Sequence, residues 1–138
     1  MISESPVIIC GFPSPAQDYT ESSLDFNTYL DVRRPSVYAL RAKGVSMIGA
    51  GIYPEDIILV DKAKQAHHGS LVVACIDGSF TLKRLFLKPK VVLHPENPDY
   101  NDIVLEKDEE LTIFGVVTAV VRKLWKKQSY EALLNNLS

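Results

Sequence analysis

Apolar residues from residue 36 onward occur in short runs that alternate with polar positions and are separated by turn residues. Runs of this length predict β-strands rather than helices. We expect strands over residues 38–42, 57–60, 71–76, 80–87, 91–93 and 111–121. Asp77 and Gly78 lie between two of these runs and predict a tight hairpin, because a type I′ turn needs positive φ at two successive residues. The pattern therefore favours a mainly β protein with a compact twisted fold, barrel-like or a sandwich.

The two ends of the chain follow different patterns. Residues 1–35 contain four prolines among polar residues, which predicts an extended N-terminal arm with a short helix around residues 23–30. Residues 126–138 predict a short C-terminal helix, with Ser129 as its N-cap and apolar residues at helical spacing. We therefore expect an arm over 1–35, a β domain over 36–125 and a tail over 126–138. Trp125 is expected to anchor the tail by packing.

Composition limits the classes of protein to consider. The 138 residues are 46% hydrophobic and 23% charged with a net charge of −2, which is typical of one soluble globular domain. No apolar run approaches the roughly 18–20 residues needed to cross a bilayer, and the N-terminus does not resemble a signal peptide. Two cysteines, Cys10 and Cys75, are too few for a disulfide framework. We expect a cytoplasmic protein with no membrane partner.

Ser46 and Lys83 are the candidate catalytic residues. Ser46 lies in a predicted helical turn over residues 46–50, and a serine hydroxyl becomes a good nucleophile only when a base removes its proton. Lysine can be that base when burial lowers its pKa. Lys83 lies in a strongly apolar predicted strand, but Arg84 lies beside it on the opposite face. The alternation of apolar residues does not decide which of the two cations is buried.

Simpler interpretations of the same residues remain open. Ser46 could be an N-cap, Lys83 could lie on a solvated strand face, and Cys10 could be a small buried hydrophobe. No spacing of Cys, His and carboxylates matches a metal site, so we expect no metal and no other cofactor. The basic cluster over residues 122–127 is expected to form a solvated helix face, not a sequence-specific DNA-binding surface.

Four motifs, which occur in order along most of the chain, favour the catalytic interpretation over the simpler ones. They are Cys10-Gly11-Phe12-Pro13, Gly44-x-Ser46-Met47, Phe80-Thr81-x-Lys83 and His94-Pro95-Glu96-Asn97. The first resembles the cleavage site of UmuD proteins, the SOS-response accessory subunits of a translesion DNA polymerase. The others resemble segments of the wider LexA-type family of Ser-Lys autoproteases. One departure is Gly49, which stands where many members carry an acidic residue.

The resemblance implies a fold of the LexA/UmuD C-terminal-domain type and a specific activity. Members cleave their own arm at a small-residue–Gly bond, here Cys10–Gly11, on contact with the recombinase filament on single-stranded DNA. Ser46 would be the nucleophile, Lys83 its base, and the backbone N–H of Met47 an oxyanion donor. The processed form would serve an error-prone translesion polymerase as an accessory subunit. Family members are generally homodimers, and the apolar run 111–121 carries more apolar surface than one sheet face can bury, which predicts a pairing edge.

Three alternatives share parts of this description. A LexA-type repressor needs a helix-turn-helix before the cleavage site, and the nine residues before Cys10 cannot form one. A type I signal peptidase uses the same chemistry but needs a membrane anchor. The short arm keeps a third alternative open, a constitutive interaction module that does not cleave itself.

Overall fold

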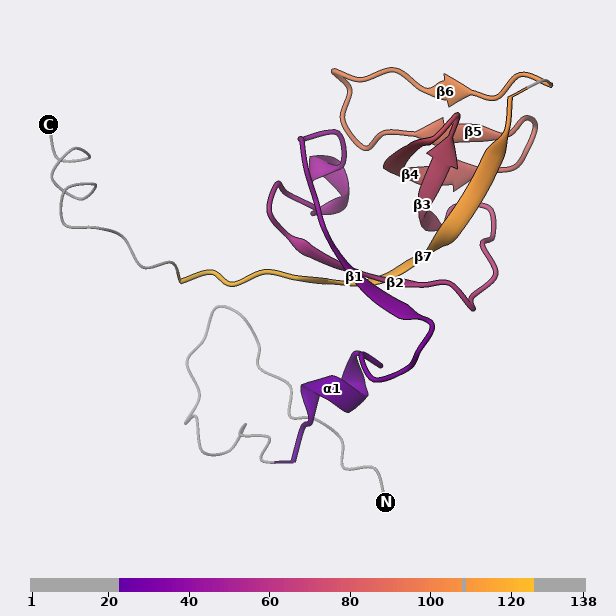
Figure 1. Cartoon of the computed structure of the whole chain (residues 1–138). Coiled ribbons are helices and arrows are strands. Elements are labelled where there is room, and N and C mark those ends of the chain that lie inside the picture. Colours follow the sequence, from indigo (N-terminus) through magenta and orange to yellow (C-terminus); the bar gives the residue numbers. More distant parts are fainter. Residues whose placement is uncertain (1–22, 108, 126–138) are drawn as a thin grey trace, which may run out of the picture.

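Seven strands form one antiparallel sheet in the spatial order β1-β2-β7-β3-β4-β5-β6 (Figure 1). The computed structural model describes residues 23–107 and 109–125. The strands are β1 (Val37–Arg41), β2 (Ile57–Asp61), β3 (Leu71–Ile76), β4 (Ser79–Phe86), β5 (Val92–His94), β6 (Ile103–Val104) and β7 (Leu111–Val121). Two short helices, α1 (Phe26–Tyr29) and the 3-10 helix η2 (Ile48–Ala50), complete the described part. The expectation of a mainly β fold is confirmed.

The strands predicted from the apolar pattern are present with small shifts of their ends. Strands β3 and β4 pair from Leu71 with Arg84 to Ile76 with Ser79, and Asp77 and Gly78 form the connecting turn. Both turn residues have positive φ, 49° and 85°, as the predicted hairpin requires. The helix expected around residues 23–30 is confirmed as α1, whose N-cap Asp25 accepts a hydrogen bond from the Asn27 N–H at 2.9 Å.

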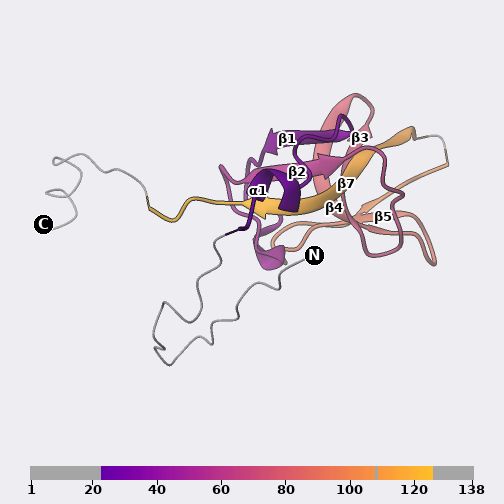
Figure 2. The same cartoon turned by 90° about the horizontal axis from the view of Figure 1, so that it is seen from below.

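Strand β7 is long and lies between β2 and β3, so it joins the two parts of the sheet (Figures 1 and 2). Its first part pairs with β3 as far as Val116, and its second part pairs with β2 from Val116 onward. Gly115 lies at this change of partner, where a Cβ would stand 2.6 Å from the Val60 side chain. The run 111–121 is therefore not an outermost strand as expected, but each of its halves is paired on one side only. Residues 117–121 have one edge that pairs with no described strand, and residues 111–115 have such an edge on the opposite side.

Two apolar clusters hold the sheet together. One combines residues of β2 with residues of the loop after β1, among them Met47, Ile52 and Val60. The other combines residues of β3, β4 and β5, among them Val72, Leu85 and Leu93. Val60, Val72 and Leu93 have no exposed surface, so each contributes roughly 1.5–3 kcal/mol through removal of apolar surface from water. The first cluster supports the loop that carries Ser46.

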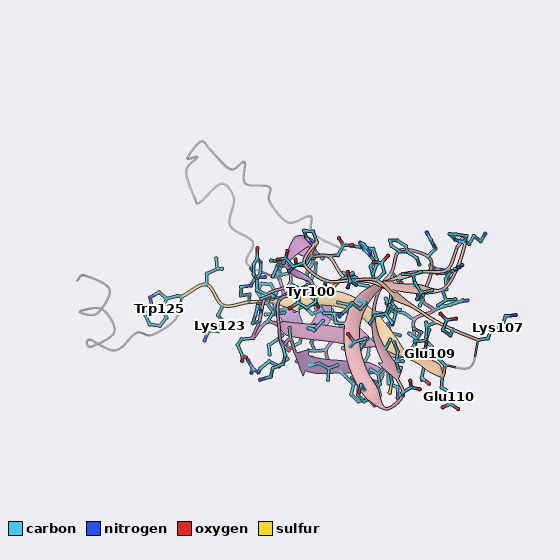
Figure 3. The ribbon with its side chains drawn as sticks, turned by 90° about the horizontal axis from the view of Figure 1, so that it is seen from above. Tyr100, Lys107, Glu109, Glu110, Lys123 and Trp125 are labelled. Carbon is cyan, nitrogen blue, oxygen red and sulfur yellow. The ribbon has the colours of Figure 1, made fainter. Side chains whose placement is uncertain are left out.

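The segment beyond β7 differs from the expectation. Trp125 is 77% exposed and Leu124 is 88% exposed, so Trp125 does not pack against any described residue as an anchor would. Figure 3 shows Trp125 and Lys123 on a segment that leads away from the sheet, at the opposite end of the molecule from Glu109 and Glu110. The predicted arm residues Cys10 and Gly11 and the predicted tail helix lie outside the described residues. No helix in the described ranges is long and apolar enough to span a membrane.

Candidate active site

A pocket of about 250 Å³ opens between the end of β1, the loop that follows it and the first half of β4. Its apolar wall comes mainly from Leu40, Ile58, Val73, Phe80 and Leu82. Its polar groups include Ser46, Thr81 and Lys83. The two predicted catalytic residues therefore line one pocket although 37 residues separate them in the sequence.

The Lys83 ammonium nitrogen lies within hydrogen-bond distance of the Ser46 hydroxyl. Lys83 Nζ donates to Ser46 Oγ at 3.1 Å, to Thr81 Oγ1 at 2.7 Å and to the Leu82 carbonyl at 3.0 Å. These acceptors match the three donors of an ammonium group. Thr81 can hold Nζ in this way because residues two apart on a strand face the same side. Sequence reasoning missed Thr81 as a site residue, and its i−2 spacing from Lys83 is the signal that could have found it.

Burial alters the proton affinity of Lys83. The side chain is only 9% exposed, and this burial lowers the pKa of Lys83 from its ordinary value of 10.5. Among the described residues, no carboxylate lies within ion-pair distance of Nζ to oppose that effect. The solvated-face interpretation of Lys83 is therefore wrong. A lysine in these surroundings loses its proton more easily than an exposed one.

Ser46 is carried by the loop between β1 and β2. The Ala42 N–H donates to the Asp56 carbonyl and the Glu55 N–H donates to the Ala42 carbonyl, and these two bonds close the neck of the loop. The helical turn expected over residues 46–50 is the 3-10 helix η2, but its N-cap is Met47, without a side-chain capping bond. Ser46 therefore does not serve as the N-cap. Its hydroxyl is directed to Lys83 instead.

An ion pair between the partly exposed Arg122 and the buried Asp56 connects the same loop to the residue after β7. Arg122 Nε and Nη2 donate to the two carboxylate oxygens of Asp56 at 2.6 and 2.7 Å, and Nη2 also donates to the Gly51 carbonyl at 2.7 Å. Asp56 is 2% exposed, so this pair is more strongly fixed than a surface ion pair. Arg122 was expected on a solvated helix face, and this expectation is wrong.

Met47, the predicted oxyanion donor, directly follows the nucleophile in a buried position. Its side chain is 3% exposed, and its sulfur accepts a hydrogen bond from the Glu96 N–H at 3.4 Å. Its own N–H donates to no other residue within the described ranges, so that N–H is available to a ligand.

Arg84 is on the other side of β4 and pairs with Glu96. No group of three or more potential metal ligands occurs in the described part of the chain.

Comparison with known proteins places this site in a family. Residues 6–118 match the family described as Peptidase S24-like. Protein SamA of Salmonella typhimurium (strain LT2) is 50% identical over 114 residues, which cover 82% of this chain and 79% of SamA. Protein MucA of Escherichia coli is 46% identical over 113 residues, with 80% and 77% covered. A LexA repressor of Polaromonas is 38% identical over 117 residues, and the match covers 49% of that repressor.

The comparisons agree with the motifs and with the fold. The matched region includes the loop of Ser46, the strand of Lys83 and most of β7. The resemblance that the motifs around Ser46 and Lys83 indicated is confirmed at the level of the family. The chain belongs to the Peptidase S24-like family.

Proposed function

We propose that this protein is a self-cleaving SOS mutagenesis protein in which Ser46 cuts the Cys10–Gly11 bond and Lys83 is the general base. The observation that carries the proposal is the 3.1 Å contact between Lys83 Nζ and Ser46 Oγ in a mainly apolar pocket. Membership of the Peptidase S24-like family supports a serine-type autoprotease in general. A lysine base needs no acid to orient it, unlike the histidine of a Ser-His-Asp triad.

The reaction begins with proton transfer. Neutral Lys83 accepts the Ser46 hydroxyl proton, and Oγ attacks the carbonyl carbon of Cys10. The Met47 N–H would stabilise the negative charge on the carbonyl oxygen. When the tetrahedral intermediate collapses, the C–N bond breaks and the Lys83 ammonium gives its proton to the Gly11 amine. Water, deprotonated by Lys83, then hydrolyses the ester on Ser46 and restores the enzyme.

The arm is long enough for this reaction. Ser23, the first described residue, is thirteen residues on from Cys10. Thirteen residues can span about 45 Å when fully extended, which exceeds the roughly 37 Å of the eleven-residue strand β7. We propose that an arm of this reach brings the Cys10–Gly11 bond to a Ser46–Lys83 pocket.

The proposed partners follow from the family resemblance and from the sheet. The recombinase filament on single-stranded DNA would stimulate cleavage, and the processed form would bind the catalytic subunit of a translesion polymerase in the cytoplasm. A homodimer would form through the open edge of residues 117–121, where Val120 and Val121 are 36% and 38% exposed. Val120→Asp should give monomers by light scattering. A monomeric wild type at high micromolar concentration would remove the dimer proposal.

Mass spectrometry of the purified full-length chain tests the cleavage. At alkaline pH we expect a fragment that begins at Gly11, and we expect none from Ser46→Ala. A wild-type chain that stays intact would favour the non-cleaving interaction module instead. A fragment with another N-terminus would place the cleavage site elsewhere in the arm.

A further inference from the structure

The connection between β5 and β6 holds the backbone on both sides of Ser46. Asn97 Nδ2 donates to the carbonyl of Val45 at 2.9 Å, directly before the nucleophile. Three residues after the nucleophile, the Gly49 N–H donates to the Glu96 carbonyl at 2.7 Å. Asn97 is 8% exposed, so its amide is withdrawn from water and committed to this contact. We call Glu96 and Asn97 the brace.

The contact between Gly49 and the brace is too close for any side chain at position 49. A Cβ on Gly49 would stand 2.5 Å from the Glu96 carbonyl oxygen and 3.2 Å from its carbon. Real Cβ atoms do not approach backbone atoms so closely, and backbone cannot move aside as a flexible side chain can. Gly49 is therefore the residue that lets the brace reach the loop.

The brace is tied to the strand that carries Lys83. Arg84 Nε donates to Glu96 Oε1 at 2.5 Å, and Arg84 Nη1 donates to the Gly69 carbonyl at 2.6 Å. Both side chains of the ion pair are about three-quarters buried, since Arg84 is 31% and Glu96 is 25% exposed. Strand β4 is thus connected to the nucleophile loop in two ways. Lys83 bonds Ser46 directly, and Arg84, on the other face, binds Glu96, whose carbonyl accepts from the Gly49 N–H.

We propose that Asn97 and Glu96 are positioning residues that hold the Ser46 hydroxyl in front of Lys83, with Arg84 fixing Glu96. This inference rests on the proposed self-cleavage and adds residues that touch neither the reacting atoms nor the substrate. The Val45 carbonyl and the Gly49 N–H are both held, so the backbone around Ser46 has little freedom to rotate. A displacement of about 1 Å at a reacting group can lower a rate by roughly a hundredfold.

The test compares Asn97→Ala and Asn97→Asp with wild type in the full-length protein. Asn97→Asp keeps an acceptor for the Asp99 N–H, which Asn97 Oδ1 now accepts at 2.9 Å, but it loses the donor to Val45. Cleavage is measured on the high-pH plateau, where the base is neutral in every variant, and at a temperature where unfolding curves show all variants folded. Both variants should cleave about 10 to 100 times more slowly. The matched control is Asp99→Asn, an exposed change in the same turn, which should cleave at the wild-type rate.

A second readout does not depend on cleavage. Hydrogen exchange of the Gly49 amide, followed by NMR in the Ser46→Ala background, reports whether its bond to Glu96 persists. Exchange at Gly49 should become faster in both Asn97 variants and stay unchanged in Asp99→Asn. Wild-type plateau rates in both Asn97 variants would overturn the positioning role. Absence of wild-type cleavage would instead overturn the proposed function, and unchanged Gly49 exchange would then overturn the brace as well.

Discussion

Lys83 and Arg84 are neighbours on β4, and the two faces of the strand give them opposite surroundings. Lys83 is 9% exposed, and the acceptors of its hydrogen bonds in the described part of the chain are neutral groups of Ser46, Thr81 and Leu82. Arg84 faces the other way and binds the carboxylate of Glu96 at 2.5 Å. Burial lowers the pKa of Lys83, whereas Arg84 has a carboxylate as its partner.

The difference separates two tasks that a cation can perform. A base must release its proton near the working pH, which requires that the charged form be penalised. A residue that holds two segments together by an ion pair must keep its charge. A guanidinium group does so and can donate hydrogen bonds in two directions at once. Strand β4 therefore places Lys83, the proposed base, in the pocket and Arg84, an ion-pairing residue, against Glu96 of the brace.

Removing the base should have the largest effect. Lys83→Ala and Lys83→Arg should each lower the cleavage rate by about a thousandfold or more, because neither residue can accept the Ser46 proton. The double variant Ser46→Ala/Lys83→Ala should be no slower than either single variant, since the two residues act as a unit. Mass spectrometry of timed samples measures all of these rates. A Lys83→Ala protein that cleaves normally would show that another group is the base.

A methyl group at position 49 should act next most strongly. Gly49→Ala forces the Cβ against the Glu96 carbonyl, so either the loop or the brace must move. We expect a plateau cleavage rate roughly 10 to 100 times lower, with Lys83 still titrating below its ordinary pKa. Rate measurements across pH separate the two effects. Wild-type cleavage by Gly49→Ala would mean that the loop tolerates displacement.

Removing the Arg84 side chain should have a smaller effect on cleavage. Arg84→Ala leaves Glu96 without its partner and should lower the cleavage rate by about tenfold, with about 1 kcal/mol lost from the free energy of unfolding. Denaturant unfolding and plateau rates measure the two quantities. Lys107→Ala is the control, because Lys107 is exposed and does not line the pocket. Equal results for the two variants would contradict a special role for Arg84.

Removal of the Thr81 hydroxyl should shift the pH dependence with little other change. Thr81 Oγ1 accepts a hydrogen bond from the charged form of Lys83 at 2.7 Å, so Thr81→Val should lower the pKa of Lys83 further. The midpoint of the pH–rate profile should move to lower pH, while the plateau rate changes by a few-fold. A midpoint that moves upward would mean that Thr81 favours the neutral amine instead.

The sequence predicted the strands well because their apolar alternation is local. The Asp77-Gly78 turn and the whole of Leu71–Ile76 needed nothing beyond neighbouring residues. The choice between Lys83 and Arg84 could not be made in this way. It depends on the loop over residues 43–56 and on Glu96, which are brought to β4 only by the tertiary fold.

Other features were missed for the same reason. Strand β6 has only two residues, which is too short for any period to identify. The pairing of Arg122 with Asp56 joins residues 66 positions apart, and no local pattern connects them. The apolar run of β7 indicated a strand correctly, but it could not say that the two halves of the strand have different neighbours.

The pH–rate profile of the full-length wild-type protein tests the central claim most directly. The rate at which the fragment beginning at Gly11 appears should rise about tenfold per pH unit and then level off. The neutral fraction of a base grows in this way below its pKa, so the midpoint should lie below 10.5, the ordinary value for lysine. Lys83→Ala should lose the profile entirely. A profile that is flat, or that persists in Lys83→Ala, would contradict the assignment of Lys83 as the base that activates Ser46.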